Sequence, residues 1–161
     1  MVYIISGKKD SGKTTRMEEL FRNTKNAAGF ISKKIVQDGL VTGYDIIELS
    51  SGHRVRFARV KGYEPEAWHE RTQIGKFSFS KEGLRAAEGI IHNALEAENS
   101  GISTKSIFLD EIGKLELKGD GFCKLLTQLL KKEYLDIYIA VRSGNIKSVL
   151  RNFAITDYRI L

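Results

Sequence analysis

The 161-residue sequence has one cysteine, one proline and no long hydrophobic run. Because Cys123 has no partner for an internal disulfide, we expect a protein of a reducing compartment, the cytoplasm. No apolar stretch approaches the length of about 20 residues that a membrane helix needs. The first residues also lack the basic segment and cleavage site of a signal peptide. We therefore expect no membrane partner.

The sequence also lacks repeats, low-complexity segments and any recognisable linker, so we predict a single domain over residues 1–161. Its 26 Lys and Arg against 20 Asp and Glu give a net charge of +6. These basic residues are scattered among acidic ones and form no basic stripe, which makes a nucleic-acid partner unlikely. Pro65 lies in the least patterned stretch, residues 61–75, which we expect to be a loop.

The spacing of apolar residues predicts an alternation of strands and helices. Strands are expected at residues 2–6, 29–36, 42–49, 54–60, 77–79, 107–109, 137–141 and 155–160. Helices are expected at residues 13–22, from an N-cap at Ser80 to Glu98, from an N-cap at Asp120 to Leu130, and at residues 143–152.

This order of elements predicts an α/β fold in three layers, with a mainly parallel central sheet and helices on both faces. The middle of the chain differs, because the Asp38-Gly39 pair is a hairpin signal between two predicted strands. We therefore predict an antiparallel, β-rich insertion over approximately residues 27–79. The motif described next indicates that the domain itself is of the P-loop type.

Residues 7–14 match the phosphate-binding pattern G-x-x-x-x-G-K-S/T, between a predicted strand and a predicted helix. Glycines let the backbone aim its N–H groups at an anion, and the helix adds its positive dipole end. Lys13 is expected to reach the β- and γ-phosphates, and the Thr14 hydroxyl to bind Mg²⁺. The predicted nucleotide-binding residues are Gly7, Lys8, Lys9, Asp10, Ser11, Gly12, Lys13, Thr14 and Thr15.

A second acidic motif follows the apolar run Ile107-Phe108-Leu109. Asp110 would emerge at the C-terminal edge of the sheet and is the predicted Mg²⁺ partner of Thr14. Glu111 follows it and could activate water as a general base. The alternative is that both carboxylates form an ordinary solvated pair at the end of a strand.

In P-loop proteins with a catalytic Glu after the metal Asp, the strand order resembles 5-1-4-3-2. One strand then lies between the P-loop strand and the metal strand, and residues 137–141 would supply it. This placement brings Arg142 close to the γ-phosphate, as a candidate for stabilising the transition state. The alternative is an exposed arginine near the start of a helix.

Residues 110–116, Asp-Glu-Ile-Gly-Lys-Leu-Glu, resemble the D-E-I-G-K-M-E signature of the small cancer-related nucleoside-triphosphatase family, which also occurs in thermophiles. The Gly-Lys-Thr-Thr at the end of the P-loop, Gly29-Phe30 and residues 74–77 are similar to other motifs of that family. Two departures are Leu115 for the usual Met and Tyr44 for the hairpin Phe.

The resemblance implies a RecA-like fold and slow hydrolysis of nucleoside triphosphates to diphosphate and phosphate, with broad base tolerance. By position, it makes Lys13 and Thr14 the phosphate and Mg²⁺ ligands, Asp110 the metal acid and Glu111 the base. The partner would be ATP, GTP or another nucleoside triphosphate, the cofactor Mg²⁺, and the state a monomer.

Two other functions stay open. The β-rich insertion could form the acceptor site of a nucleotide or small-molecule kinase, or the chain could be a nucleotide-loaded switch. The absence of an N-K-x-D motif argues against a guanine-specific switch. Trp68 could stack on a base or anchor its loop by packing, and Arg54, Arg56 and Arg59 could face the phosphates or form the wet face of a sheet.

Overall fold

The structure, a computed structural model, describes residues 1–97 and 103–161. In these ranges the strands are β1 (Val2–Gly7), β2 (Ala27–Gln37), β3 (Leu40–Glu48), β4 (Arg54–Val60), β5 (Glu70–Ile74), β6 (Phe77–Ser80), β7 (Ser106–Leu109), β8 (Asp136–Arg142) and β9 (Tyr158–Ile160). The helices are α1 (Lys13–Arg22), α2 (Lys81–Glu96), α3 (Cys123–Leu129) and α4 (Ile146–Asn152).

All of these strands join one nine-stranded sheet in the order β5-β6-β4-β3-β2-β7-β8-β1-β9. Among the strands with parallel pairing, the order β9-β1-β8-β7-β2 corresponds to the predicted 5-1-4-3-2. The prediction that one strand separates the P-loop strand from the metal strand is confirmed, because β8 lies between β1 and β7. This arrangement fits the fold of a P-loop protein.

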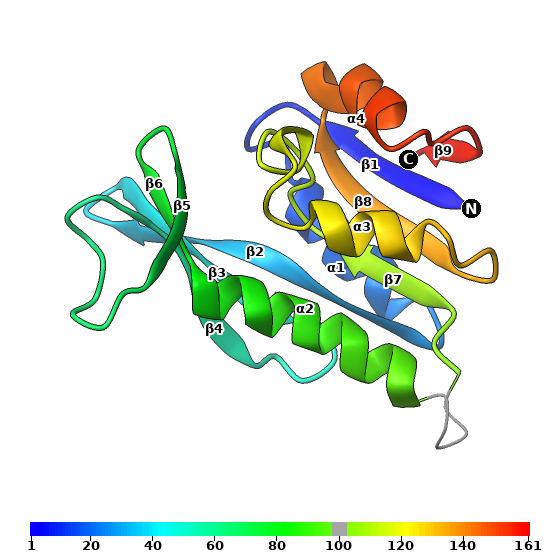
Figure 1. Cartoon of the computed structure of the whole chain (residues 1–161), viewed down its shortest axis with the longest axis horizontal. Coiled ribbons are helices and arrows are strands. Elements are labelled where there is room, and N and C mark those ends of the chain that lie inside the picture. Colours follow the sequence, from blue (N-terminus) through cyan, green and yellow to red (C-terminus); the bar gives the residue numbers. More distant parts are fainter. Residues whose placement is uncertain (98–102) are drawn as a thin grey trace.

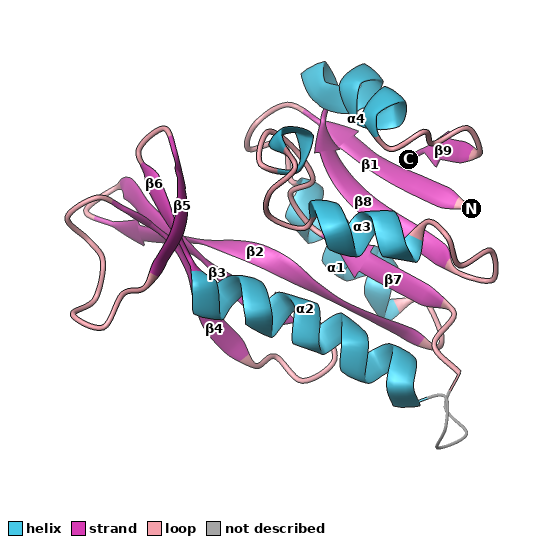
Figure 2. Ribbon diagram, viewed as in Figure 1, coloured by secondary structure: helices cyan, strands magenta, loops and turns pink. Residues whose placement is uncertain are grey.

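The prediction of a mainly parallel sheet holds only for the central strands, because the whole sheet is mixed. The predicted antiparallel insertion is present, but it is part of the same sheet. Strands β3, β4, β6 and β5 continue it with antiparallel pairs, as many as the parallel ones. The long strand β2 belongs to both parts. Its first residues pair with β7 in parallel, and the rest pair with β3 in a hairpin. The insertion therefore extends the central sheet, and the β5–β6 hairpin projects from its far end (Figures 1 and 2), with α2 starting directly after β6.

The molecule has the three layers that the sequence predicts. Alternate residues of the central strands point to opposite faces, as the period of two requires. Ile4, Ile107 and Ile137 pack in the larger core with residues of α2, α3 and α4. Ile5 and Phe108 pack on the other face, against Met17 of α1. Figure 1 shows α1 behind the sheet and α2 and α3 in front of it.

Several predicted boundaries need correction. The loop predicted at residues 61–75 contains strand β5, which pairs with β6 at the edge of the sheet. The predicted N-cap at Asp120 is wrong, because α3 begins at Cys123 with Phe122 in the capping position. A 3₁₀ turn, Ser143–Asn145, precedes α4. The last strand is shorter than predicted, starting at Tyr158.

The start of α2 confirms the predicted cap at Ser80, whose hydroxyl accepts the Gly83 N–H at 2.8 Å. The predicted end of this helix, Glu98, lies outside the described residues. None of the helices in the described ranges combines the length and apolar composition that crossing a membrane requires.

The outer part of the sheet has its own polar core. The buried guanidinium of Arg59 on β4 donates to the buried carboxylate of Asp45 on β3 at 2.7 Å. It also lies over the ring of Trp68, whose indole N–H donates to the Ser78 hydroxyl at 2.7 Å. Trp68 is therefore a packing anchor, and Arg59 belongs neither to a phosphate cleft nor to a wet face.

Candidate active site

The predicted site residues converge where the parallel strands end. Gly7, the last residue of β1, pairs with Arg142, the last residue of β8. Leu109, the last residue of β7, pairs with Ile139 of β8 and is followed by Asp110 and Glu111. Because these strands are parallel, their carboxyl ends share one edge of the sheet, where ligands of open α/β sheets bind.

The P-loop connects β1 to α1 through a turn that needs its glycines. Gly12 has a φ of 83°, in the left-handed region that glycine adopts without steric cost. A Cβ atom on Gly7 would lie 2.1 Å from the Ser11 hydroxyl oxygen. Helix α1 begins at Lys13, so its free N–H groups face the loop. The turn at Gly12 is therefore formed by contacts within residues 7–14.

The lysine of this loop is folded over the loop itself. Lys13 Nζ donates to the carbonyl oxygen of Lys8 at 2.7 Å and to that of Gly7 at 3.3 Å. Both acceptors are neutral, so the ammonium charge is available to a phosphate. Lys8, Lys9, Asp10, Ser11 and Thr15 are exposed around it. Asp10 forms an ion pair with Lys34 of β2, which ties the loop to the hairpin.

The two predicted metal ligands touch each other. The Thr14 hydroxyl donates to Asp110 Oδ2 at 2.9 Å, across a sequence separation of 96 residues. The same carboxylate accepts the N–H of Ser32 at 3.1 Å and, through Oδ1, the N–H of Glu111 at 3.0 Å. Only 1% of Asp110 is exposed. This burial, with a smaller contribution from the charge of Glu111, raises the pKa of the Asp110 carboxyl to about 6.

The pair of Thr14 and Asp110 fits Mg²⁺. Both offer hard oxygen atoms at the end of the P-loop, and Mg²⁺ is usually held by one or two protein oxygens together with water and substrate phosphates. No cluster of three or more His, Cys, Asp or Glu side chains able to hold a metal occurs in the described ranges. A magnesium ion here would therefore depend on the phosphates of a nucleotide for its remaining ligands.

Glu111 is held in an unusual backbone conformation. Its φ of 62° lies in the left-handed region, which a non-glycine residue occupies at a cost of the order of 1 kcal/mol. This turn directs its carboxylate out of the sheet edge, where the Glu111 side chain is 40% exposed. Arg142 Nη2 lies 3.4 Å from Glu111 Oε2. The predicted base and the predicted cation are therefore neighbours.

Glu116, for which the sequence predicts no role of its own, organises the loop after Glu111. Its buried carboxylate accepts the Gly113 N–H at 2.8 Å and the Phe122 N–H at 3.1 Å. Burial raises the pKa of this carboxyl. These contacts fold residues 113–122 into a compact loop. Lys114 of this loop and Lys13 of the P-loop both line the cavity that is described next. In the sequence, the third acidic residue of the 110–116 motif was the signal that could have indicated this structural role.

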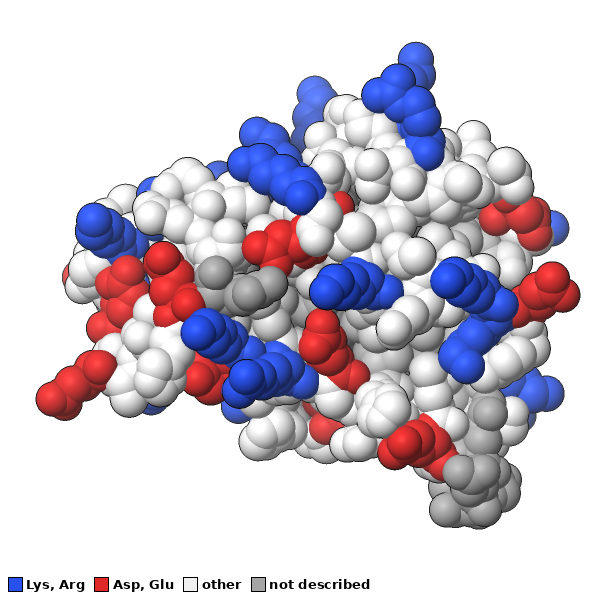
Figure 3. Space-filling model, in the orientation of Figure 1, with Lys and Arg blue, Asp and Glu red and all other residues white. Residues whose placement is uncertain are grey.

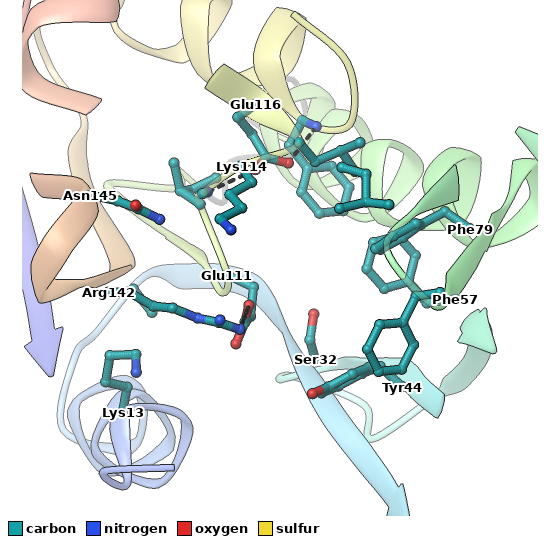
Figure 4. Close-up of a pocket in the computed structure, with 17 residues that line it drawn as sticks. Lys13, Ser32, Tyr44, Phe57, Phe79, Glu111, Lys114, Glu116, Arg142 and Asn145 are labelled. Carbon is teal, nitrogen blue, oxygen red and sulfur yellow. Dashed lines mark hydrogen bonds and ion pairs between the residues drawn. The ribbon is translucent and has the colours of Figure 1, made fainter. Parts of the chain in front are cut away.

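The phosphate site opens into a cavity of about 250 Å³. Lys13, Glu111 and Arg142 line one end, and aromatic residues of the antiparallel strands line the other. Figure 4 shows Arg142 and Glu111 on the P-loop side, with Ser32 between them and Tyr44. Burial, together with the charges of Glu111 and Asp110, raises the pKa of the Tyr44 hydroxyl, so it stays protonated.

The charged side chains elsewhere on this face do not gather. Figure 3 shows Lys and Arg interleaved with Asp and Glu over the surface in that view.

Known proteins resemble the chain over most of its length. A family model described as NTPase matches residues 2–157. The nucleoside-triphosphatase THEP1 of Archaeoglobus fulgidus is 26% identical over 146 residues, which cover 89% of this chain and 79% of that protein.

Two solved structures share the fold. The crystal structure of THEP1 from Aquifex aeolicus has a TM-score of 0.74 and 21% identity, covering 100% of this chain and 88% of that one. The solution structure of a human cancer-related nucleoside triphosphatase has a TM-score of 0.68 and 24% identity, with 99% and 86% covered. The family resemblance predicted from residues 110–116 is confirmed.

Proposed function

The chain belongs to the NTPase family, and on that premise we propose that it hydrolyses nucleoside triphosphates to diphosphate and phosphate with Mg²⁺ as cofactor. One observation carries the proposal. The P-loop lysine, the Thr14–Asp110 pair, Glu111 and Arg142 come from separate segments of the chain and meet at one sheet edge.

In this mechanism the P-loop N–H groups and Lys13 hold the β- and γ-phosphates. Thr14 and Asp110 hold the Mg²⁺ ion, which when bound neutralises charge on the phosphate oxygens. Glu111 accepts a proton from water as the water oxygen attacks the γ-phosphorus. The bond from that phosphorus to the bridging oxygen breaks, and the nucleoside diphosphate leaves.

Arg142 contributes charge to the transition state. Its side chain is 43% exposed, and its Nη2 atom lies 3.4 Å from Glu111 Oε2, so a γ-phosphate can compete with Glu111 for the guanidinium. Movement of Arg142 onto the phosphate oxygens would release the Glu111 carboxylate to bind water. The same binding event would thus prepare the base and position the cation.

The test is phosphate release from each of the four nucleoside triphosphates, with Mg²⁺ or with a chelator. Glu111→Gln is expected to lower the rate by about 10²–10⁴-fold without loss of nucleotide binding. Glu133→Gln is the matched control, because Glu133 is exposed on the turn that leads into the opposite, N-terminal end of β8. Full activity in Lys13→Ala would contradict the assignment of this site.

We propose further that the protein accepts several bases, turns over slowly and works as a monomer in the cytoplasm. The first two properties come from the family resemblance. A monomer is supported by the fact that one chain supplies every residue of the site. Phosphate transfer to a kinase-type acceptor gets no support from the relatives, which are named for triphosphatase activity.

A further inference from the structure

The cavity at the sheet edge is larger than hydrolysis requires. A water molecule needs one place beside Glu111, but the cavity continues from there into the antiparallel part of the sheet. Its far wall consists of residues that the proposed mechanism does not use: Tyr44 on β3, Phe57 on β4, Ile74 on β5, and Phe77 and Phe79 on β6.

The in-line geometry of phosphoryl transfer determines which side of the γ-phosphate this aromatic wall faces. The leaving diphosphate stays on the P-loop, and the attacking oxygen must approach from the opposite side because the displacement is in line. Glu111, as the base, lies on the side of attack. The aromatic wall lies beyond Glu111 and Ser32 as seen from Lys13 (Figure 4). The wall therefore faces the position of the attacking oxygen, and the nucleoside lies on the other side.

The wall is apolar and incompletely covered. The rings of Tyr44 and Phe77 meet edge to face at 5.3 Å, and those of Phe57 and Phe79 at 5.2 Å. Phe57 is buried, whereas Tyr44, Phe77 and Phe79 are half-buried and contribute apolar surface to the cavity. Aromatic surface of this kind is stabilised by contact with another ring.

A buried polar group beside this wall has no partner. The Ser32 hydroxyl oxygen makes no hydrogen bond to any described residue, although Ser32 is only 4% exposed. It lines the cavity between Glu111 and Tyr44 (Figure 4). An unpaired buried hydroxyl costs about 1–3 kcal/mol. The Ser32 oxygen itself has almost no accessible surface, so the Ser32 side chain must rotate toward the cavity for this oxygen to gain a ligand as its partner. A ligand hydroxyl could accept from or donate to Ser32 and also donate to the Glu111 carboxylate.

From these observations we propose that the cavity binds a small aromatic alcohol, with its ring on the wall of Tyr44, Phe77 and Phe79 and its hydroxyl between Ser32 and Glu111. The hydroxyl then takes the place of the attacking water. The cavity volume of about 250 Å³ includes the end beside Lys13, where the γ-phosphate would lie, so the rest has room for at most a single substituted ring. Sites for drug-sized ligands usually enclose about 300–1,000 Å³. This inference rests on the proposed function only for the position of the γ-phosphate.

Occupancy has two possible chemical results, and both require the alcohol to displace water. The alcohol oxygen can attack the γ-phosphorus, with its proton passing to Glu111 and the nucleoside diphosphate leaving, to give a phosphate ester. Alternatively the bound alcohol blocks water and the triphosphate persists. In either case the release of inorganic phosphate falls, and the KM for the nucleotide stays unchanged because the P-loop is untouched.

The probes for the test are benzyl alcohol and 2-phenylethanol, and glycerol serves as a hydroxyl compound without a ring. With γ-labelled ATP and Mg²⁺, inorganic phosphate and phosphate ester are separated and counted. At about ten times the dissociation constant of an aromatic probe, which for so small a ligand is expected to be millimolar, phosphate release falls roughly tenfold. Glycerol at the same concentration has no such effect. Unchanged phosphate release with no ester overturns the proposal.

Variants identify the cavity as the place of binding. Ile74→Trp fills the cavity from β5 and is expected to abolish the effect of both probes while keeping basal hydrolysis. Ile160→Trp, on the exposed edge strand β9, is the matched control. If Ile74→Trp does not fold, Phe77→Ala replaces it and is expected to weaken the probe at least about fivefold. A probe effect that persists in a folded variant overturns the site.

Direct binding separates this proposal from the proposed function. Saturation-transfer NMR with benzyl alcohol, in the presence of Mg²⁺ and a non-hydrolysable ATP analogue, reports occupancy without any turnover. Saturable binding that is lost in Ile74→Trp supports the cavity even if basal hydrolysis is absent, in which case only the proposed function fails. Hydrolysis without saturable binding removes the cavity proposal alone.

Discussion

Arg142 and Glu111 form an ion pair of 3.4 Å at the ends of two neighbouring strands, although they lie 31 residues apart in the sequence. Each is partly exposed, so the pair contributes little to stability. Its significance is that the cation and the carboxylate that the proposed mechanism uses occupy adjacent positions in the structure without a nucleotide. Binding of the γ-phosphate can exchange one partner of Arg142 for another.

We predict that Arg142→Ala lowers the turnover number by about 10³-fold with a small change in nucleotide affinity, because the guanidinium acts on charge that develops in the transition state. Single-turnover phosphate release and fluorescent-nucleotide binding measure the two quantities. Arg151→Ala, on the exposed side of α4, is the control. An unchanged turnover number in Arg142→Ala contradicts the role assigned to Arg142.

From the raised pKa of the Asp110 carboxyl we predict how the free energy of unfolding depends on pH when no metal is bound. Its pKa is raised from 3.8 to about 6, so its stabilising contribution is complete below pH 3.8 and is lost as the pH rises through about 6. In a chelator at pH 7.5, Asp110→Asn should therefore be more stable than the wild type by roughly 1–3 kcal/mol. Thermal unfolding between pH 3 and 8 measures the difference, which should vanish only as the pH falls to about 3.8. A variant that is less stable at every pH contradicts this reading of the buried carboxylate.

The buried pair of Arg59 and Asp45 predicts a loss of stability in the outer sheet. Arg59→Met leaves Asp45 buried beside only the exposed Arg54, 3.7 Å away, and should reduce the free energy of unfolding by about 3–5 kcal/mol. Arg54→Met removes the exposed partner of the same carboxylate and should cost less than about 1 kcal/mol. Urea unfolding of both variants gives the comparison. Equal losses would mean that burial does not distinguish the two arginines.

From the hydrogen bonds that Glu116 accepts, we predict that its replacement weakens only the loop of residues 113–122. Glu116→Ala leaves the N–H groups of Gly113 and Phe122 without their acceptor, at a cost of about 1–3 kcal/mol for each. Amide hydrogen exchange should then accelerate in this loop and stay unchanged in β1 and α1. Glu116→Gln keeps one acceptor oxygen and should be intermediate. Uniform acceleration over the whole chain would indicate global destabilisation instead.

Much of the site could be predicted from the sequence because its parts are local. The P-loop is a run of eight residues between one strand and one helix, and its turn at Gly12 needs no distant contact. Asp110 and Glu111 likewise follow a buried strand directly. Their meeting with the P-loop followed from the parallel direction of the strands, which brings their ends to one edge.

The errors of prediction have a different origin. Strand β5 is short, lies at the edge and has one neighbour, so its polar sequence carries no core pattern. The N-cap of α3 was predicted wrongly at Asp120 because a more distant residue also binds the backbone there. The carboxylate of Glu116 accepts the Phe122 N–H just before the helix. That the antiparallel insertion continues the central sheet was missed because β2 pairs in parallel with β7 and antiparallel with β3 along one continuous strand.

By itself, then, the sequence predicted a phosphate-binding loop at residues 7–14 and a pair of carboxylates at the end of a buried strand. Only the tertiary structure decided which other residues stand around the place proposed for the γ-phosphate. The N–H of Ser32 reaches Asp110 across 78 residues, and Tyr44 and Phe77 meet only because β4 and β6 follow β3 in the sheet. Such contacts depend on strand order and register, and these are set by burial over the whole domain.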